Sequence, residues 1–336
     1  MLEPGALSAP APAPPLLEVR GLAKTYVGAG GARLRALDGV SFSMARGEAL
    51  GIVGESGCGK STLARALLRL NGACEGSVFF EGEDIMALSA RALARRRADM
   101  QIVFQDPAGA LNPRHKVRTL VGEPLRIHGR EWRARVPELL AMVGLGAEAA
   151  GRFAHEFSGG QRQRVAIARA LALSPKLLIA DEPVSALDVS IQSQIINLIA
   201  DLRRALGLTL IFISHDLSVI RHVSDRIAVM YFGRIVEMGA AADILERPAH
   251  PYTKALLAAV PRLGGRRAAA APPEGEPPDP AHPPPGCAFQ SRCPQALGVC
   301  AREKPELVTR VAPEGPRVTA CHLHPAAALQ PGADPG

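Results

Sequence analysis

Apolar and polar residues over the first 240 positions follow two alternating periods. Short apolar runs, continuous or with period 2, predict strands, and longer stretches with period 3.6 predict helices. The predicted strands are a short edge strand over 17–20, then 35–44, 49–53, 76–82, 101–105, 176–182, 208–213 and a hairpin of 226–232 and 234–238. The predicted helices are 62–68, 89–97, 162–173 and 191–206. Strands that alternate with helices indicate an α/β fold with a largely parallel sheet.

Two departures from this pattern predict the domain organisation. Helical periodicity dominates from 106 to 155, with helices over 117–128 and 132–143, and indicates a helical insertion between two halves of the α/β core. Near Ala240 the α/β pattern stops, and a Pro/Ala-rich stretch predicts an extended linker. The predicted parts are a disordered leader 1–15, an α/β domain 16–240 with a helical subdomain at about 106–165, a helical extension 241–267, the linker 268–286, a cysteine region 287–324 and a disordered tail 325–336.

Composition and charge limit the possible partners and the cellular compartment of the protein. Hydrophobic residues make up 47% of the 336 residues, which is enough for a sizeable core, and the net charge of +7 is mild for this length. The scattered arginines form no dedicated basic tract, so no nucleic-acid partner is expected. The chain shows neither an apolar run of about 20 residues nor the features of a secretory signal at its start, and we expect it to remain in the cytoplasm. Disulfides between its six cysteines are not expected in that compartment.

A glycine-rich segment directly follows the apolar run 49–53 and precedes a predicted helix. It fits the phosphate-loop pattern G-x-x-x-x-G-K-[ST] in its strand–loop–helix context. Its backbone N–H groups and the helix N-terminus favour a phosphate group. Lys60 is expected to contact the β- and γ-phosphates, and Ser61 to bind Mg²⁺. The candidate residues are Gly54, Glu55, Ser56, Gly57, Cys58, Gly59, Lys60, Ser61 and Thr62.

Two acids end the buried strand at 177–181. Asp181 lies where the carboxyl edge of a parallel sheet places ligands, and we expect it to hold hydrated Mg²⁺. Glu182 is adjacent and is expected to polarise an attacking water. Phosphoryl transfer depends on this positioning and charge neutralisation more than on covalent chemistry.

Further motifs in order resemble those of the ATP-binding cassette (ABC) ATPases, over about 16–238. The matching residues are the adenine-stacking aromatic Tyr26, the Q-loop Gln105, the signature Ser158, Gly159, Gly160 and Gln161, the D-loop ending at Asp188, and the switch histidine His215. Phe157 stands where the family most often has Leu. The resemblance implies a P-loop NTPase (RecA-like) core with an antiparallel β subdomain, a helical subdomain and a small cysteine-bearing C-terminal tail domain.

The family mechanism implies roles for these residues. Two such domains enclose two ATP molecules head to tail, with the phosphate loop of one facing the signature of the other. Gln105, with Ser61 and Asp181, would contact Mg²⁺ and couple the site to a membrane partner. Glu182 and His215 would be catalytic, with His215 against the γ-phosphate, and Asp188 would organise the dimer interface.

The downstream half resembles the ATPases of oligopeptide and dipeptide importers, in their second, F-type subunit. The segments that carry this resemblance are 102–107, 111–114, 181–190, 250–257 and 283–293. It implies a sister ATPase, two permeases and an extracytoplasmic solute-binding protein as partners, and a peripheral place on the cytoplasmic face of the inner membrane. Nickel or glutathione transport, a soluble cassette ATPase that acts on nucleic acid or ribosomes, and a regulatory ATP-binding module are the alternatives.

Four cysteines lie in the tail: Cys287, Cys293, Cys300 and Cys321. Thiols gathered in a cytosolic tail favour a metal site over disulfides. Their gaps are wider than the tight pairs typical of structural zinc, and four thiolates equally hold a [4Fe–4S] cluster. The resemblance favours the cluster, because related importer subunits carry one in this tail. Zinc, or reduced cysteines that only pack as small hydrophobic residues, are the alternatives. Cys58 and Cys74 are expected to be structural.

Overall fold

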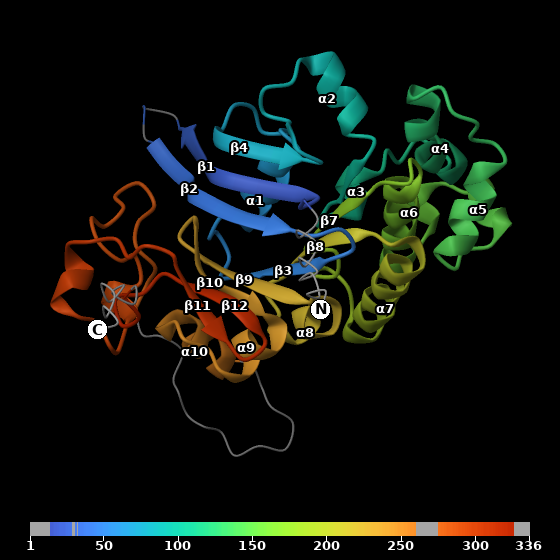
Figure 1. The fold of residues 1–336 in the computed structure, drawn as a ribbon. Coiled ribbons are helices and arrows are strands. Elements are labelled where there is room, and N and C mark those ends of the chain that lie inside the picture. The colour runs from blue at the N-terminus through green and yellow to red at the C-terminus, as the bar shows by residue number, and fades with distance from the viewer. Residues whose placement is uncertain (1–13, 29–30, 32, 260–274, 326–336) are drawn as a thin grey trace, which may run out of the picture.

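The protein's structure, a computed structural model, describes residues 14–28, 31, 33–259 and 275–325. It contains two sheets (Figure 1). The first is a four-stranded antiparallel sheet with the order β2-β1-β4-β5. Its strands are β1 (Leu17–Val27), β2 (Arg33–Met44), β4 (Glu75–Phe80) and β5 (Glu83–Asp84). The strands of the second, in its order, are β11 (Val308–Ala312), β12 (Gly315–Thr319), β10 (Arg234–Ala240), β9 (Arg226–Tyr231), β3 (Ala49–Val53), β8 (Thr209–Ile213), β7 (Leu177–Asp181) and β6 (Met100–Val103).

The prediction of a short edge strand at 17–20 is wrong. β1 has 11 residues and lies inside its sheet, between β2 and β4. Its pairing with β2 shifts register between Val19 and Leu22 and again before Thr25. These irregularities interrupt the alternation of buried and exposed positions, so the sequence pattern fades after Arg20 although the strand continues.

The centre of the second sheet is parallel, as the alternation of strands and helices predicts. β3 pairs in parallel with β8 and β9, and β7 pairs in parallel with β6 and β8. All residues of β3, β7 and β8 are buried, which is typical of parallel strands covered on both faces. The predicted hairpin around Gly233 is confirmed as the antiparallel pair β9–β10.

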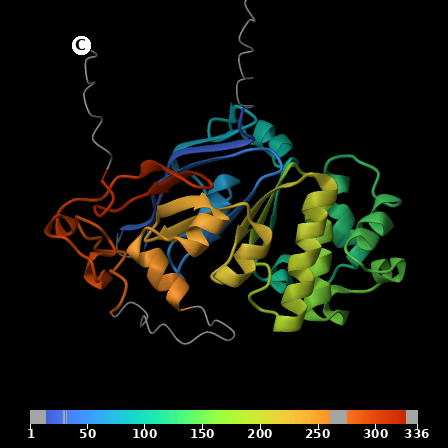
Figure 2. The ribbon, with the colours of Figure 1, turned by 60° about the horizontal axis from the view of Figure 1, so that its bottom comes forward.

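Helices cover this sheet and build a separate lobe. They are α1 (Lys60–Leu67), α2 (Ala90–Arg96), α3 (Pro107–Ala110), α4 (Val117–Ile127), α5 (Arg135–Met142), α6 (Gly159–Leu171), α7 (Val189–Leu206), α8 (Leu217–Val223), α9 (Ala241–Glu246) and α10 (Pro251–Ala258). α4 and α5 pack against α6 and form the predicted helical insertion (Figures 1 and 2). The pattern did not predict α3 or α8, whereas α9 and α10 lie within the predicted helical extension 241–267, whose residues 260–267 lie outside the part of the chain that the structure describes. Among the described residues, the structure has no helix long and apolar enough to cross a membrane.

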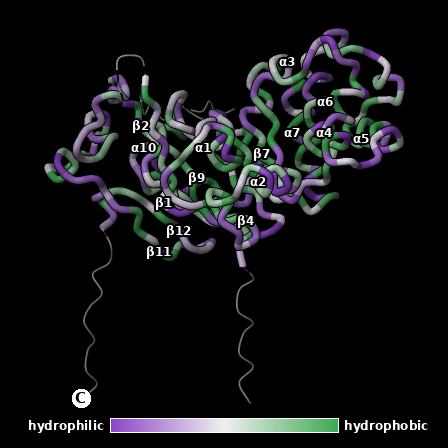
Figure 3. The backbone as a smooth tube through the Cα atoms, turned by 90° about the horizontal axis from the view of Figure 1, so that it is seen from above, coloured by the Kyte–Doolittle hydropathy of each residue, from purple (hydrophilic) through white to green (hydrophobic). Residues whose placement is uncertain are grey.

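The cysteine region lies at the end of the molecule opposite the helical lobe in Figures 1 and 2. Its hairpin β11–β12 extends the second sheet, because β12 pairs antiparallel with β10 at Glu237 and Met238. Phe289 is fully buried in the same core cluster as the central strands. Figure 3 shows hydrophobic segments, in green, around β9 and β7 in the middle of the molecule and within the helical lobe. The region is therefore built onto the α/β core through both its backbone and its side chains.

His250 predicts a pH-dependent stability. It is 1% exposed, its Nδ1 accepts a hydrogen bond from Tyr252 N–H at 3.0 Å, and it caps α10. Burial lowers the pKa of His250 to about 4. A depressed pKa contributes stability above the unfolded value of about 6.5, and that stability is lost as pH falls toward 4. We expect the free energy of unfolding to decrease by about 3 kcal/mol across this window.

The measurement is urea unfolding at several pH values. His250→Asn is the matched variant, because Asn is a good helix cap that does not titrate. In this variant the free energy of unfolding should change much less between pH 6.5 and 4. An equally steep loss in this variant would contradict the assignment to His250.

Candidate active site

The phosphate loop connects the buried strand β3 to α1 and is held tightly by its surroundings. At Gly54 an added Cβ would lie 2.2 Å from the carbonyl oxygen of Met230. Gly59 has φ 106° and an added Cβ there would lie 2.4 Å from the carbonyl oxygen of Ala36. Both contacts are with backbone, so neither site accepts a side chain. The glycines therefore let the loop pass between β9 and β2 while its amides stay free to surround a phosphate.

Lys60 is the first residue of α1 and is 4% exposed. Its Nζ donates hydrogen bonds to the carbonyl oxygens of Gly54 at 2.8 Å and Glu55 at 2.9 Å. It also lies 3.9 Å from Glu182 Oε1. The loop's own carbonyls thus hold the ammonium group inside the ring that the loop forms, where a phosphate oxygen would meet it.

Ser61 and Asp181 come together from different elements. Ser61 Oγ donates a hydrogen bond to Asp181 Oδ1 at 3.0 Å, at the carboxyl end of β7. Asp181 is 1% exposed, and burial raises the pKa of its carboxyl group, against the effect of the Ser61 hydrogen bond. A hydroxyl and a carboxylate side by side are the oxygen donors that Mg²⁺ prefers, so this pair fits the predicted ion.

Glu182 is the centre of the predicted catalytic residues. Gln105 Nε2 donates to its Oε2 at 3.1 Å, and His215 Nδ1 lies 3.4 Å from the same oxygen. Its backbone has φ 46°, an uncommon conformation for a residue with a side chain. Its N–H donates to Ile213 O at 3.1 Å. The strained turn after β7 directs the carboxylate toward Lys60 and the residues that follow β6 and β8.

The signature segment begins α6 and leaves its polar face exposed. Ser158 and Gln161 form a reciprocal cap: Gln161 N–H donates to Ser158 Oγ at 3.4 Å, and Ser158 N–H donates to Gln161 Oε1 at 3.1 Å. An added Cβ at Gly160 would lie 2.5 Å from Ile191 Cγ2, so this glycine lets α6 pack against α7. Ser158 and Gly159 are exposed and accessible to a partner.

The other predicted residues have varied surroundings. Tyr26 lies at the end of β1, where its hydroxyl accepts a hydrogen bond from Asn71 Nδ2 at 3.0 Å and Lys24 Nζ lies 5.3 Å from the ring centroid. Cys58 is buried, and burial raises the pKa of its thiol. Asp188 is exposed at the start of α7. Adenine stacking by Tyr26 and dimer contact by Asp188 remain predictions.

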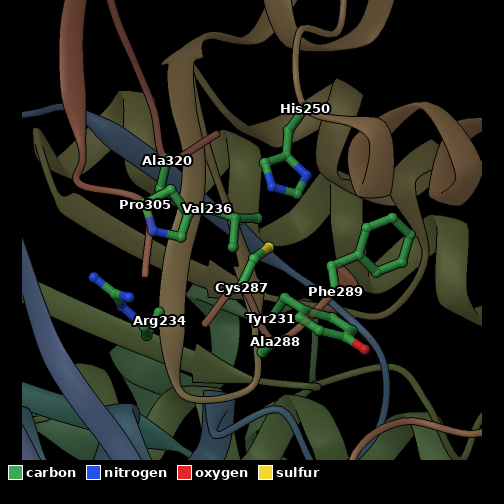
Figure 4. Close-up of a pocket in the computed structure, with 9 residues that line it drawn as sticks. All are labelled: Tyr231, Arg234, Val236, His250, Cys287, Ala288, Phe289, Pro305 and Ala320. Carbon is green, nitrogen blue, oxygen red and sulfur yellow. The ribbon is translucent and has the colours of Figure 1, made fainter. Parts of the chain in front are cut away.

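Two residues that hold the phosphate loop were not predicted from the sequence. Glu55 N–H donates to the buried Tyr252 hydroxyl at 2.9 Å, and Arg292 donates to both oxygens of the Glu55 carboxylate at 2.9 and 3.0 Å. Tyr252 packs with Tyr231 and Phe289, with ring centroids 4.6 and 5.4 Å away. Figure 4 shows the Tyr231 and Phe289 rings together with Cys287 of the cysteine region. Tyr252 and Arg292 lie in segments that carry the importer resemblance, but nothing in the local sequence indicates their contact with the loop.

The four tail cysteines gather without forming a ligand shell. Burial, together with smaller contributions from charge repulsion by Cys300, Cys321 and Cys293, raises the pKa of the Cys287 thiol to about 11. The thiols thus lie close enough to affect one another's ionisation. Within the part of the chain that the structure describes, however, no group of three or more His, Cys, Asp or Glu side chains is arranged to hold a metal ion. The donor types fit a cluster or zinc, but the structure does not support either.

The fold and this site define an ATP-binding cassette ATPase. The comparisons agree: residues 37–185 match the family model described as "ABC transporter", and 236–300 match "Oligopeptide/dipeptide transporter, C-terminal region". The oligopeptide transport ATP-binding protein AppF of Bacillus subtilis is 51% identical over 87% of this chain and 90% of its own length. The dipeptide transport ATP-binding protein DppF of Escherichia coli is 50% identical over 82% of this chain and 84% of its own.

Solved structures agree with this assignment. A dimeric ATP-binding cassette in a post-hydrolysis state, bound to ADP and phosphate, matches with a TM-score of 0.61 and 32% identity over 67% of this chain and 98% of its own. The chain belongs to the family of ATP-binding proteins of oligopeptide and dipeptide ABC transporters. It is an ATPase, and ATP with Mg²⁺ is its expected substrate.

Proposed function

We propose that this chain powers an importer for dipeptides or oligopeptides. The relatives with about 50% identity carry peptide-transport names and match most of the chain. The observation that carries the ATPase part of the proposal is the contact of Glu182 with Lys60, Gln105 and His215, whereas the peptide cargo rests on these relatives. It brings into one cluster the phosphate-binding lysine, the acid expected to activate water, the glutamine expected to contact Mg²⁺ and the histidine expected to contact the γ-phosphate.

The chain's residues divide the reaction between them. Lys60 would neutralise the β- and γ-phosphates. Ser61, Gln105 and Asp181 would hold Mg²⁺, which would offset phosphate charge. Glu182 orients and polarises the attacking water, and His215 contacts the γ-phosphate. The signature Ser158, Gly159, Gly160 and Gln161 completes the site of a sister ATPase in a head-to-tail dimer. Exposed Ser158, Gly159 and Asp188 support this arrangement.

ATP-driven closure of that dimer moves two permeases, which take solute from an extracytoplasmic binding protein. The chain would then sit peripherally on the cytoplasmic face of the membrane. The permease would contact the helical insertion, which packs on α6. Gln105 contacts Glu182 in the site and lies just before α3, so it links the site to the insertion. When the dimer closes on ATP, a movement of Gln105 would then move the helical insertion.

The test is peptide uptake by vesicles that contain the full proposed complex: this chain, a sister ATPase, two permeases and a binding protein. Peptide uptake that requires ATP and is lost when this subunit is omitted supports the proposal. Uptake of nickel or glutathione but no peptide would overturn the cargo and keep the ATPase role. ATP hydrolysis stimulated by RNA or ribosomes and indifferent to permeases would overturn the transport role.

We also propose that Cys287, Cys293, Cys300 and Cys321 hold a [4Fe–4S] cluster. The support is the donor set: four thiols within range of one another's charge in one region of a chain expected to lack disulfides. Bound iron would reverse their ionisation, because a cation stabilises thiolates.

The cluster has a direct assay. Protein purified without oxygen should contain about four irons and four sulfides and absorb visible light. Cys293→Ser should lose the iron and sulfide and the visible absorbance. Cys74→Ser should keep them, because Cys74 lies outside the tail. Zinc without iron, or no metal in anaerobic protein, would contradict this proposal.

A further inference from the structure

One residue of the phosphate loop, Glu55, is held by parts of the chain far from it in sequence. Its backbone N–H donates to Tyr252 of α10, and its carboxylate receives two hydrogen bonds from Arg292 in the cysteine region. Arg292 is enclosed, with 7% of its side chain exposed, whereas the Glu55 side chain is 31% exposed. Arg292 Nη1 also lies 3.4 Å from the Tyr231 hydroxyl. The guanidinium group is therefore fixed by its surroundings and meets the carboxylate in a bidentate geometry.

The charge of Glu55 matters because of where the loop binds its ligand. A carboxylate in a loop that surrounds a triphosphate repels it, and Lys60 is only partly free to compensate, since Glu182 lies 3.9 Å from its Nζ. Arg292 cancels the charge of Glu55 before ATP arrives. Arg292 is also adjacent in sequence to Cys293, so the fold of the cysteine region determines the position of its guanidinium group.

We propose that Arg292 is a positioning residue for ATP binding: it neutralises Glu55 and fixes the phosphate loop from the cysteine region. It touches Glu55 and not the reacting atoms, so its removal affects ATP affinity and leaves the chemical step intact. This gives the tail a role in the ATPase reaction that does not depend on what the cysteines bind.

The experiment measures KM for ATP and kcat in the assembled complex, with ATP affinity measured by equilibrium dialysis. Arg292→Gln should raise KM about tenfold and leave kcat within about twofold. Arg292→Lys should fall between, because lysine keeps the charge but loses the bidentate geometry. Adding Glu55→Gln to Arg292→Gln should restore KM to within about threefold of the original. A structural role alone predicts no such rescue.

Lys304→Gln is the matched control. It removes another ion pair between the tail and the rest of the chain, Lys304 Nζ to Asp38 Oδ2 at 3.1 Å, whose acid lies in β2. It should leave KM unchanged. An equal rise in this control, no rise in folded Arg292→Gln, or a double variant as weak as Arg292→Gln would each overturn the proposal.

If Arg292→Gln does not fold, the single variant Glu55→Gln, which keeps Arg292, tests the proposal instead. It leaves the Arg292 cation uncompensated beside the loop, so KM should fall about threefold. An unchanged or raised KM would overturn the charge mechanism.

Discussion

Replacing Glu182 with Gln is expected to reduce ATP hydrolysis at least about 100-fold while ATP stays bound. Glutamine keeps the size of the side chain but accepts no proton and carries no negative charge beside Gln105 Nε2 and His215 Nδ1, which lie 3.1 and 3.4 Å from Glu182 Oε2. ATP binding loses nothing, because one negative charge near the phosphates is removed. Phosphate release at saturating ATP measures the first effect, and nucleotide retained through gel filtration measures the second.

Glu18→Gln is the matched control for this change. It makes the same substitution in β1, where Glu18 pairs with Arg20 on the surface of the antiparallel sheet. It should leave hydrolysis and nucleotide retention as they were. If Glu182→Gln keeps more than about a tenth of the original turnover in the assembled complex, Glu182 does not activate the water.

The chemistry of the site was largely predictable because each part is encoded locally. Lys60 and Ser61 follow β3, while Asp181 ends β7 and Glu182 follows it, so each pair is placed by one strand. Parallel pairing of β3 and β7 with β8 brings the strand ends to one edge of the sheet. The contacts between Ser61 and Asp181, and between Glu182 and His215, follow from that topology.

The contribution of the tail was not predictable in the same way. β12 joins β10 through only two residue pairs, Glu237 with Thr319 and Met238 with Val318, and no local pattern in 308–319 specifies that partner. The Arg292–Glu55 ion pair likewise joins two segments 237 residues apart in sequence. Such non-local contacts are selected by packing around Phe289 and Tyr252, which periodicity along the chain does not report.

The same distinction explains the cysteines. Their count and spacing indicated a metal site, but four residues spread over 287–321 determine no geometry by themselves. Geometry depends on the turns that carry them, such as the one in which Cys287 N–H donates to Cys300 O at 2.8 Å. Sequence could therefore supply the donor types, and only the arrangement of those turns can supply a ligand shell.

Replacing Lys60 with Met is expected to weaken ATP binding about 100-fold with little loss of stability. Methionine keeps most of the apolar volume of the side chain but carries no charge and donates no hydrogen bond. The expected loss corresponds to about 3 kcal/mol, the contribution of one or two charge-assisted hydrogen bonds. The loss of stability should stay at about 1 kcal/mol, because only the hydrogen bond to the Gly54 carbonyl is buried, whereas the one to the Glu55 carbonyl is part-buried and water can replace it.

Lys176→Met separates this effect from a general loss of positive charge. Lys176 precedes β7 at the amino edge of the sheet, away from the site, where its Nζ lies 2.8 Å from Glu81 Oε2. Equilibrium dialysis with ATP should give an unchanged Kd for this variant, and thermal unfolding should give both variants a Tm close to the original. A tenfold or smaller loss in Lys60→Met would show that the loop amides, and not the lysine, supply most of the affinity. The Arg292 and Glu55 variants should then have larger effects on ATP affinity than the Lys60 variant, because they change the position of those amides and the electrostatic field around them.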